Sequence, residues 1–152
     1  MPDLTLRLAT AADEHRLVRC IDRAYAVYAN SVPDLPAVSE GIIEDITSNI
    51  VWVADLAGQI VGVLVLVRNT GSLSLANVAV DPSQKGQGLG KKLMELATSE
   101  AIRLGKASLR LSTHIDMPEN VALYTHLGWQ ETGREGNKVH MSKSIEMPTP
   151  KN

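Results

Sequence analysis

A glycine-rich loop is the segment whose residue types and spacing most clearly indicate chemistry. Three glycines alternate there with other residues, and lysines stand on both sides: Lys85-Gly86-Gln87-Gly88-Leu89-Gly90-Lys91-Lys92. Glycine lets backbone N–H groups converge without clashes from Cβ atoms, and the start of a following helix adds about half a positive charge. We therefore expect this loop to form an anion site that suits a phosphate or a pyrophosphate.

Two common phosphate-binding motifs do not match this loop. A P-loop has four residues between its glycines, followed by lysine and then serine or threonine. Here three residues separate Gly86 from Gly90, and Lys92 stands where the hydroxyl would be. The dinucleotide fingerprint is G-x-G-x-x-G, whereas the loop reads G-x-G-x-G. The residues alone leave a second interpretation open, a strand-to-helix turn whose glycines serve only packing.

Hydrophobic periodicity predicts the elements that position the loop. The loop follows a strand at Leu73–Val80, which Asp81 and Pro82 end, and it opens a helix that ends at Gly105. Further strands are predicted at Leu4–Leu8, Val51–Leu56, Gln59–Arg68, Ala107–Thr113, Trp129–Glu135 and Val139–Ile145. Further helices are predicted at Ala12–Ala29 after a capping box of Thr10 and Asp13, from about Ser39 onward, and at Asn120–Leu127. This order of elements indicates the α/β (α+β) class.

Composition limits the classes of function that the chain can have. It has 152 residues, of which 44% are hydrophobic, with 15 basic and 17 acidic side chains. This length predicts a single domain at residues 1–147, followed by a frayed tail at 148–152. Aromatic residues make up only 3% and basic residues are not in excess, so the composition argues against a nucleic-acid partner.

Membrane, secretory and metal-binding classes are not indicated either. The longest apolar run, Ile60–Val67, is too short to span a bilayer, and the first residues lack the apolar core of a signal peptide. The single cysteine, Cys20, and four scattered histidines show no metal-ligand spacing. We therefore expect a cytoplasmic protein with no metal and no membrane partner.

Two separated motifs resemble those of the GCN5-related N-acetyltransferases, the GNAT superfamily. The segment Lys85–Gly90, after Val80-Asp81-Pro82, is similar to motif A of that family, usually R/Q-x-x-G-x-G/A. Residues Asn120–Tyr124 and Leu127–Trp129 are similar to the family's N-x-x-A-x-x-x-Y/LGF region, although Lys85 and Trp129 depart mildly from the usual Arg or Gln and Phe. The resemblance implies a mixed, mostly antiparallel sheet of about seven strands with about four flanking helices, splayed between strands 4 and 5.

The resemblance also implies that acetyl-CoA is the co-substrate. Its pantetheine arm would lie along the strand Leu73–Val80, and its pyrophosphate would bind the N–H groups of the glycine loop. A backbone N–H near Val78 would polarise the thioester carbonyl, and Asn120 would contact the pantetheine arm, cap its helix, or do both. The implied cofactor-binding residues are Val78, Ala79, Val80, Lys85, Gly86, Gln87, Gly88, Leu89, Gly90, Lys91 and Asn120.

Tyr124 matches the position of the family's tyrosine general acid, which protonates the departing CoA thiolate after direct attack by the amine. The residues alone leave a second interpretation open, a core tyrosine that anchors its helix. Many relatives carry a glutamate base where this chain has Ala76. His114, Asp116 and Glu119 are the candidates to replace that base, and the alternative is that they are solvated loop residues and water accepts the proton.

The resulting hypothesis is an acetyl-CoA-dependent N-acetyltransferase that acts on a primary amine of a small molecule. Two alternatives stay open, an acyl-CoA-binding module without catalysis and an enzyme that acetylates a protein or peptide. The resemblance implies that Tyr25 and Tyr28 lie near where acceptors enter in relatives, but their helical spacing favours core packing. A homodimer that pairs through the C-terminal strands is a further expectation, with Val139–Ile145 as an exposed sheet edge that Lys138 and Lys143 could equally protect.

Overall fold

Seven strands form one sheet in the order β1-β2-β3-β4-β5-β7-β6 in a computed structural model, which describes residues 3–26, 41–84 and 86–145. The strands are β1 (Leu4–Leu8), β2 (Ile50–Leu56), β3 (Gln59–Arg68), β4 (Ser72–Val80), β5 (Ser108–His114), β6 (Gln130–Glu135) and β7 (Lys138–Ser144). Neighbouring strands are antiparallel except β4 and β5, which are parallel. The predicted mixed, mostly antiparallel sheet is confirmed.

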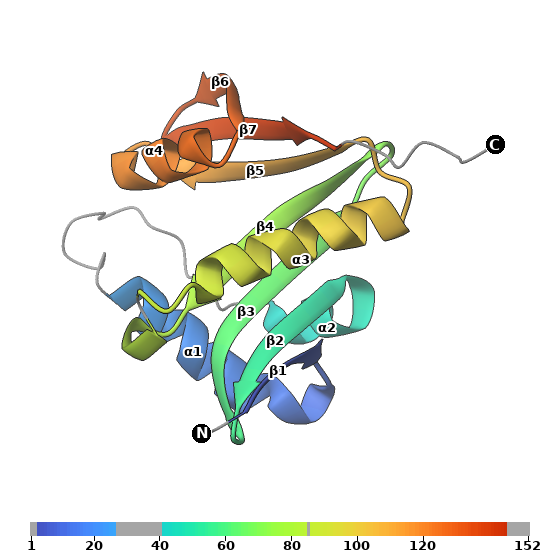
Figure 1. Cartoon of the computed structure of the whole chain (residues 1–152), viewed down its shortest axis with the longest axis vertical. Helices are drawn as coiled ribbons and strands as arrows, with labels where there is room; N and C mark the ends of the chain where they lie inside the picture. Colours follow the sequence, from blue (N-terminus) through green and yellow to red (C-terminus); the bar gives the residue numbers. More distant parts are fainter. Residues whose placement is uncertain (1–2, 27–40, 85, 146–152) are drawn as a thin grey trace.

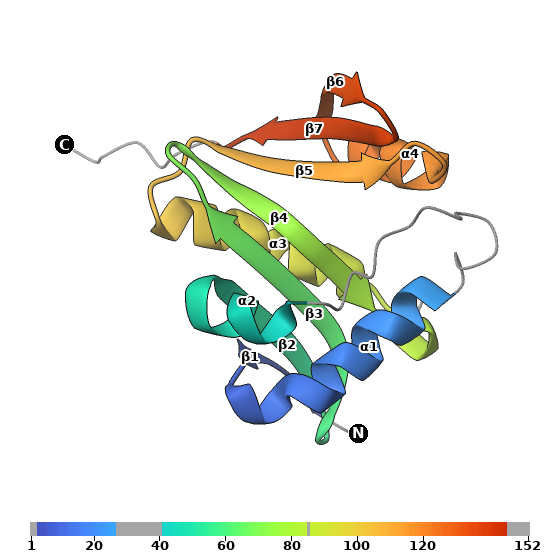
Figure 2. The ribbon, with the colours of Figure 1, turned by 180° about the vertical axis from the view of Figure 1, so that it is seen from behind.

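Helices cover both faces of this sheet. They are α1 (Glu14–Ala26), α2 (Ile42–Ser48), α3 (Leu89–Arg103) and α4 (Pro118–His126). Figure 1 shows α3 on one face, and the opposite view in Figure 2 shows α1 and α2 on the other. The predicted tail at 148–152, the end of the first predicted helix and the start of the second lie outside the described residues. None of the helices within the described ranges combines the length and apolar character needed to cross a bilayer.

The parallel strands β4 and β5 pair over only part of their length. Ser72–Leu75 pairs with Ser108–Leu111, and beyond these residues the two strands diverge toward Val80 and His114 (Figure 1). The predicted splay between the fourth and fifth strands is therefore confirmed. Since backbone groups of both strands leave the ladder where they part, the opening can accept a ligand between them.

Strand β3 explains why the sheet needs helices on both faces. Leu64 and Leu66 are fully buried in the core beneath α3, whereas Val63 and Val65 are buried in the core beneath α1. Successive side chains of a strand point to opposite faces, so an almost continuously apolar strand must be covered twice. This packing fixes α3 and α1 on either side of β4 and its continuation into the glycine loop.

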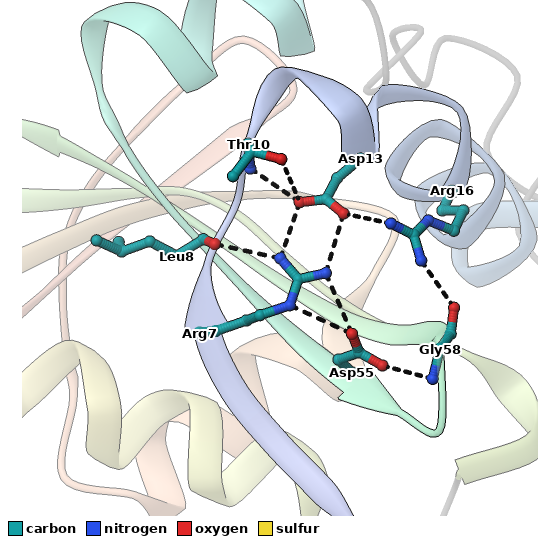
Figure 3. A network of polar contacts seen from close by, with 7 residues as sticks. All are labelled: Arg7, Leu8, Thr10, Asp13, Arg16, Asp55 and Gly58. Carbon is teal, nitrogen blue, oxygen red and sulfur yellow. Dashed lines mark hydrogen bonds and ion pairs between the residues drawn. The ribbon is translucent and has the colours of Figure 1, made fainter.

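A charged network fixes the start of α1 (Figure 3). Arg7 on β1 donates two hydrogen bonds of 2.9 Å to Asp13 and also binds Asp55 on β2, while Arg16 binds Asp13 at 2.6 Å. The hydrogen bonds from Arg7 hold the pKa of the Asp13 carboxyl well below its usual range, although burial opposes that shift. Asp13 Oδ2 also accepts the Thr10 N–H at 2.8 Å, which confirms the predicted capping box.

The C-terminal strands correct one expectation about the edge of the sheet. Val139–Ile145 was expected to be the exposed edge, but β7 lies between β5 and β6, and β6 is the edge strand. Val139 and Met141 are buried in the core, whereas most side chains of β6 are exposed. The chain therefore turns back after β6 and inserts its more apolar strand into the sheet, since only that strand can bury a face.

Candidate active site

A β-bulge in β4 marks the point where the sheet opens. Leu75 pairs with Leu66 and Asn77 pairs with Val65, so Ala76 has no partner on β3. The extra residue reverses which side chains face α3: Leu73 and Leu75 do so before the bulge, and Val78 and Val80 do so after it. The change in apolar spacing is visible in the sequence and would have predicted the bulge, which our sequence analysis did not.

The first cavity beside the bulge, which we call the α3 cavity, has a volume of about 490 Å³. Strand β4, the start of α3 and helix α4 each contribute to its walls, together with Ala24 and Tyr25 of α1. It brings together six of the residues that the resemblance assigns to the cofactor: Val78, Ala79, Val80, Gly90, Lys91 and Asn120. The side chain of Ala79 faces away, into the core beneath α1.

The glycine loop lies at the N-terminal end of α3, beside this cavity. Gly86 and Gly88 both have a φ of +78°, a conformation that side chains with a Cβ rarely adopt, and Gly88 is the N-cap of the helix. The Gln87 N–H donates to Gln84 O at 3.2 Å, and the Lys92 N–H donates to the N-cap carbonyl Gly88 O at 3.1 Å. A Cβ placed on either glycine would meet open space, so the loop has room for a bound anion.

The resemblance also assigns Lys85, Gln87 and Leu89 of the loop to the cofactor. Lys85 lies outside the described residues. Gln87 is exposed. Leu89 is the first residue of α3, and its side chain is buried in the core between α3 and the sheet. Leu89 can therefore contribute only its backbone N–H to a ligand, in agreement with its assigned part in a backbone anion site.

A second cavity, the central cavity, continues past the bulge and also has a volume of about 490 Å³. It shares residues with the α3 cavity from α1, β4, the turn before α4 and α4 itself: Tyr25, Val78, Met117, Asn120 and Tyr124. Tyr124 is half-buried, and its ring centroid lies 5.9 Å from that of Trp129 in a tilted arrangement. Its two predicted roles are compatible, because the ring packs on the core while the residue borders both cavities.

Of the predicted base candidates, one lines the central cavity. His114 is 8% exposed, and its Nδ1 accepts the N–H of Asp116 at 3.0 Å, so the neutral ring carries its proton on Nε2. The Asp116 side chain is 57% exposed, and Glu119 is exposed as well. Neither carboxylate is part of the cavity lining, which agrees with the alternative that they are solvated loop residues.

Asn120 has a different structural role from the predicted cap. The N-cap of α4 is Met117, because the helix begins at Pro118 rather than at Asn120. Asn120 Nδ2 instead donates to Thr113 Oγ1 at 3.3 Å. This contact joins α4 to β5 and holds the asparagine at the boundary between the two cavities.

Helix α1 contributes Tyr25 to both cavities and Arg23 to an ion pair beside them. Tyr25 packs on the α1-side core as predicted, but its Oη also lies 3.4 Å from Asn77 Oδ1, and it lines both cavities. Arg23 Nε donates to Asp81 Oδ2 at 2.8 Å. Burial alone would raise the pKa of Asp81, but hydrogen bonds from the Ser83 N–H and from Arg23 outweigh it and lower that pKa. Tyr28 lies outside the described residues.

No group of three His, Cys, Asp or Glu side chains within the described ranges could hold a metal ion. Cys20 is buried in the core beneath α1, and burial raises the pKa of its thiol to about 12. The polar side chains that line the α3 cavity and the central cavity include the phenols of Tyr25 and Tyr124, the imidazole of His114, and the ammonium groups of Lys91 and Lys138.

Known proteins share both the sequence pattern and the fold. The family model for the acetyltransferase (GNAT) domain matches residues 47–131. The chain is 27% identical to the uncharacterized N-acetyltransferase YjgM of Escherichia coli (strain K12), over 92% of this chain and 94% of the relative. Its fold is similar to that of PaiA N-acetyltransferase from Thermoplasma acidophilum, solved in complex with coenzyme A, with a TM-score of 0.81 and 17% identity over 94% of this chain and 99% of the other.

A third similar structure is the ribosomal-protein-S18-alanine N-acetyltransferase from Escherichia coli, with a TM-score of 0.78 and 21% identity over 97% of each chain. The family match contains the bulged strand, the glycine loop and Tyr124. The chain belongs to the acetyltransferase (GNAT) family and is an acetyl-CoA-dependent N-acetyltransferase.

Proposed function

We propose that this enzyme transfers the acetyl group to a primary amine of a small molecule by direct attack, with Tyr124 as the general acid. The observation that carries the proposal is the meeting of two cavities at Tyr124 and the β4 bulge. One cavity leads to the glycine loop and suits the co-substrate, and the other leaves room for an acceptor. The two reactants can therefore approach from different directions and meet at one point.

The α3 cavity and the glycine loop supply the groups that would hold acetyl-CoA. The N–H groups at the start of α3 suit the pyrophosphate, and Lys91 adds a positive charge beside them. The backbone of Val78 and Val80 leaves the β4–β5 ladder where the strands part, so it can pair with an amide-bearing arm as an added strand would. When bound, acetyl-CoA supplies the activated acetyl group.

Tyr124 and the β4 backbone act on opposite ends of the breaking bond. An N–H near Val78 would stabilise the negative charge that develops on the carbonyl oxygen as the amine nitrogen forms its bond to carbon. The carbon–sulfur bond then breaks, and the Tyr124 hydroxyl would give its proton to the leaving thiolate. The phenolate regains a proton from solvent, which completes the cycle.

The nitrogen must also lose a proton, and His114 is the described candidate best placed to receive it. It is buried in the central cavity that Tyr124 borders. Its Nδ1 accepts the Asp116 N–H and its Nε2 carries the proton of the neutral ring, so the imidazole would take the proton of the amine at Nδ1 after the hydrogen bond from Asp116 opens. Ala76 lines the same cavity and offers no carboxylate. A proton taken by the imidazole can pass to solvent, so no additional reactant is needed.

An acceptor panel tests this function against its alternatives. The protein is mixed with acetyl-CoA and with small primary amines or peptides, while release of CoA thiol and the mass of each acceptor are measured. The proposal predicts equal amounts of thiol and acetylated small amine. Acetylation of peptides alone would instead support a protein acetyltransferase, like the S18-alanine enzyme that the fold resembles. Tight acetyl-CoA binding with no acetylated product would support a binding module without catalysis.

A further inference from the structure

A third cavity lies on the face of β5, β7 and β6 that is turned away from the core. We call it the sheet-face cavity, and its volume is about 630 Å³. Leu109 and Leu111 of β5 are buried in the core on which α4 packs, so the alternate residues Arg110 and Ser112 point to the opposite face. The cavity shares Leu75, Ala76, Leu111 and Ser112 with the central cavity, and the two are therefore neighbours.

Cross-strand pairs give this face a basic and hydroxyl character. Arg110 is opposite Ser142, Ser112 is opposite His140, and His114 is opposite Lys138. Ser112 Oγ and His140 Nδ1 lie 2.6 Å apart in a hydrogen bond. Residues on one face that are two positions apart are separated by about 6.6 Å along a strand. Arg110, Ser112 and His114 therefore form a row along β5, in which Arg110 lines the sheet-face cavity, Ser112 lines both cavities and His114 lines the central cavity.

Neither cavity has a carboxylate among its described lining residues. Two carboxylates lie beside histidines of these cavities: Glu135 Oε2 is 3.6 Å from His140 Nε2, and Asp116 Oδ2 is 3.9 Å from His114 Nδ1. The Glu135 side chain is 86% exposed and the Asp116 side chain 57% exposed, and neither lines a cavity. A site built to hold a polyamine would need carboxylates for the amines that do not react, so the lining does not suit that class of acceptor.

Arg110 is the cation in the sheet-face cavity, and it has no carboxylate partner among the described residues. Arg19 and Arg68 likewise have no ion pair among the described residues, whereas five arginines bind a carboxylate at 3.2 Å or less: Arg7, Arg16, Arg23, Arg103 and Arg134. A guanidinium forms paired hydrogen bonds with a carboxylate because the two groups match in shape and charge. An exposed, unpaired guanidinium at the wall of a cavity whose described lining has no carboxylate is therefore complementary to an acidic ligand.

We infer that the acceptor is an amine that also carries a carboxylate, and that Arg110 binds the carboxylate. The inference rests on the proposed function, because it assigns the acceptor of the same reaction. With its acid group at Arg110, such a molecule directs its amine toward Ser112 and Ala76, where the two cavities join.

Matched acceptors test the inference. Each amino acid in a panel is compared with its own carboxamide, and kcat/KM is measured from CoA thiol release. Conversion of the carboxylate to a carboxamide lowers the pKa of the amine and so increases the fraction of the amine that is unprotonated. A higher kcat/KM for the acid therefore cannot be explained by a larger reactive fraction of its amine. We expect the best acid to exceed its carboxamide by about 10- to 100-fold. Equal or better use of the carboxamides would overturn the inference.

The Arg110→Gln variant tests whether the Arg110 side chain causes the preference for the acid over its carboxamide. We expect it to lower kcat/KM for the acid by about 10- to 100-fold, mainly through KM, while kcat/KM for the carboxamide and the Kd for acetyl-CoA stay unchanged. Arg134→Gln, on the exposed face of β6 and paired with Glu131, is the matched control and should leave both acceptors unaffected. An equal loss for acid and carboxamide in Arg110→Gln would contradict a role in carboxylate recognition.

A binding measurement separates this inference from the proposed function. N-acetyl amino acids and their carboxamides are titrated into the CoA-loaded protein by calorimetry, which requires no turnover. If no acceptor is acetylated but the wild type binds the acids better and Arg110→Gln does not, the carboxylate site at Arg110 is supported and the proposed function fails. If amines without an acid group are acetylated and the acids do not bind, the proposed function stands and the inference is wrong.

Discussion

Arg23 Nε lies 2.8 Å from Asp81 Oδ2, and this ion pair joins α1 to the residue that follows β4. Asp81 is 1% exposed and also accepts the Ser83 N–H at 3.0 Å, at the start of the segment that leads to the glycine loop. Two residues after Arg23, Tyr25 lines the α3 cavity and the central cavity. The ion pair therefore fixes α1, which forms a wall of both cavities, relative to the segment that leads into the glycine loop.

Asp81→Asn should reduce stability, because it removes the charge from a buried group that has several hydrogen bonds. We expect the free energy of unfolding to fall by about 1–3 kcal/mol. Urea unfolding followed by circular dichroism measures the change. Glu131→Gln is the control, since the Glu131–Arg134 pair is exposed and should leave the urea midpoint unchanged. An unchanged midpoint for Asp81→Asn would show that the buried ion pair contributes nothing to stability.

The pH dependence of the free energy of unfolding should show the contribution of the Asp13 carboxylate, at the start of α1. The hydrogen bonds from Arg7 lower its folded pKa, so the folded state keeps the carboxylate charged where the unfolded state takes up a proton. Its contribution is complete above the unfolded pKa of about 3.9 and is lost as the pH falls toward the lower folded value.

Urea unfolding at a series of pH values from neutral down to acid tests this sign. The wild type should lose stability as the pH falls below about 5, and Asp13→Asn should show a shallower decline from a lower starting stability. Parallel curves for the two proteins would mean that Asp13 is not responsible for the acid sensitivity.

Gly88→Ala should weaken acetyl-CoA binding. Gly88 has a φ of +78° at the N-cap of α3, and a Cβ there strains the backbone by about 1–2 kcal/mol. A shift of the backbone to relieve that strain turns the N–H groups away from the anion, so we expect the Kd for acetyl-CoA to rise about tenfold or more. Isothermal titration calorimetry measures it.

Gly71→Ala is the matched control for this loop. Gly71 has a φ of +77° with open space around its Cβ position, but it lies in the turn between β3 and β4, away from both cavities. The two variants should lose similar stability, and only Gly88→Ala should lose affinity. A similar change in Kd for both would trace the effect to general destabilisation.

Tyr124→Phe should lower kcat by about 100-fold and leave the Kd for acetyl-CoA unchanged. The substitution keeps the ring that packs beside Trp129 and removes only the hydroxyl. Thr125→Ala removes a neighbouring hydroxyl that donates to Val121 O on the exposed side of the same helix, and it should keep wild-type turnover. Unchanged kcat in Tyr124→Phe would leave Tyr124 with a packing role alone.

His114→Gln should lower kcat by about 10- to 100-fold if the imidazole receives the proton of the amine. Asp116→Asn keeps the backbone N–H that binds His114 Nδ1 and alters an exposed carboxylate, so it should retain turnover. Steady-state kinetics with saturating acetyl-CoA measures both. Equal activity of His114→Gln and the wild type would assign the proton to water.

Much of the fold follows from local patterns in the sequence. The almost continuous apolar run within Gln59–Arg68 and the proline after Asp81 predicted β3 and the end of β4 because these signals depend only on neighbouring residues. The motif around Gly86–Gly90 located the loop for the same reason. Strand order among the last strands did not follow, since Val139–Ile145 becomes internal only through pairing with β5, which is distant in sequence.

The candidate site was predictable along β4 and α3 but not across the opening. Val78, Val80 and Gly90 could be assigned because they lie in one continuous segment with a recognisable motif. Tyr25 and Arg23 could not, since their relation to Asn77 and Asp81 depends on how α1 crosses the sheet. No sequence pattern indicated that Arg110 lines a cavity, because a single arginine on a strand is common and the cavity forms only when the strands assemble.

A single-turnover experiment with isotopically labelled acetyl-CoA tests the central claim most directly. The protein is mixed in excess over acetyl-CoA that carries the label in its acetyl group, together with the panel of amino acids, amines and peptides. The account predicts that the label moves to the nitrogen of a small amine, with one CoA thiol released for each acetyl group transferred. If the label stays on CoA with every acceptor although acetyl-CoA is bound, the opening between β4 and β5 is not a site of acetyl transfer.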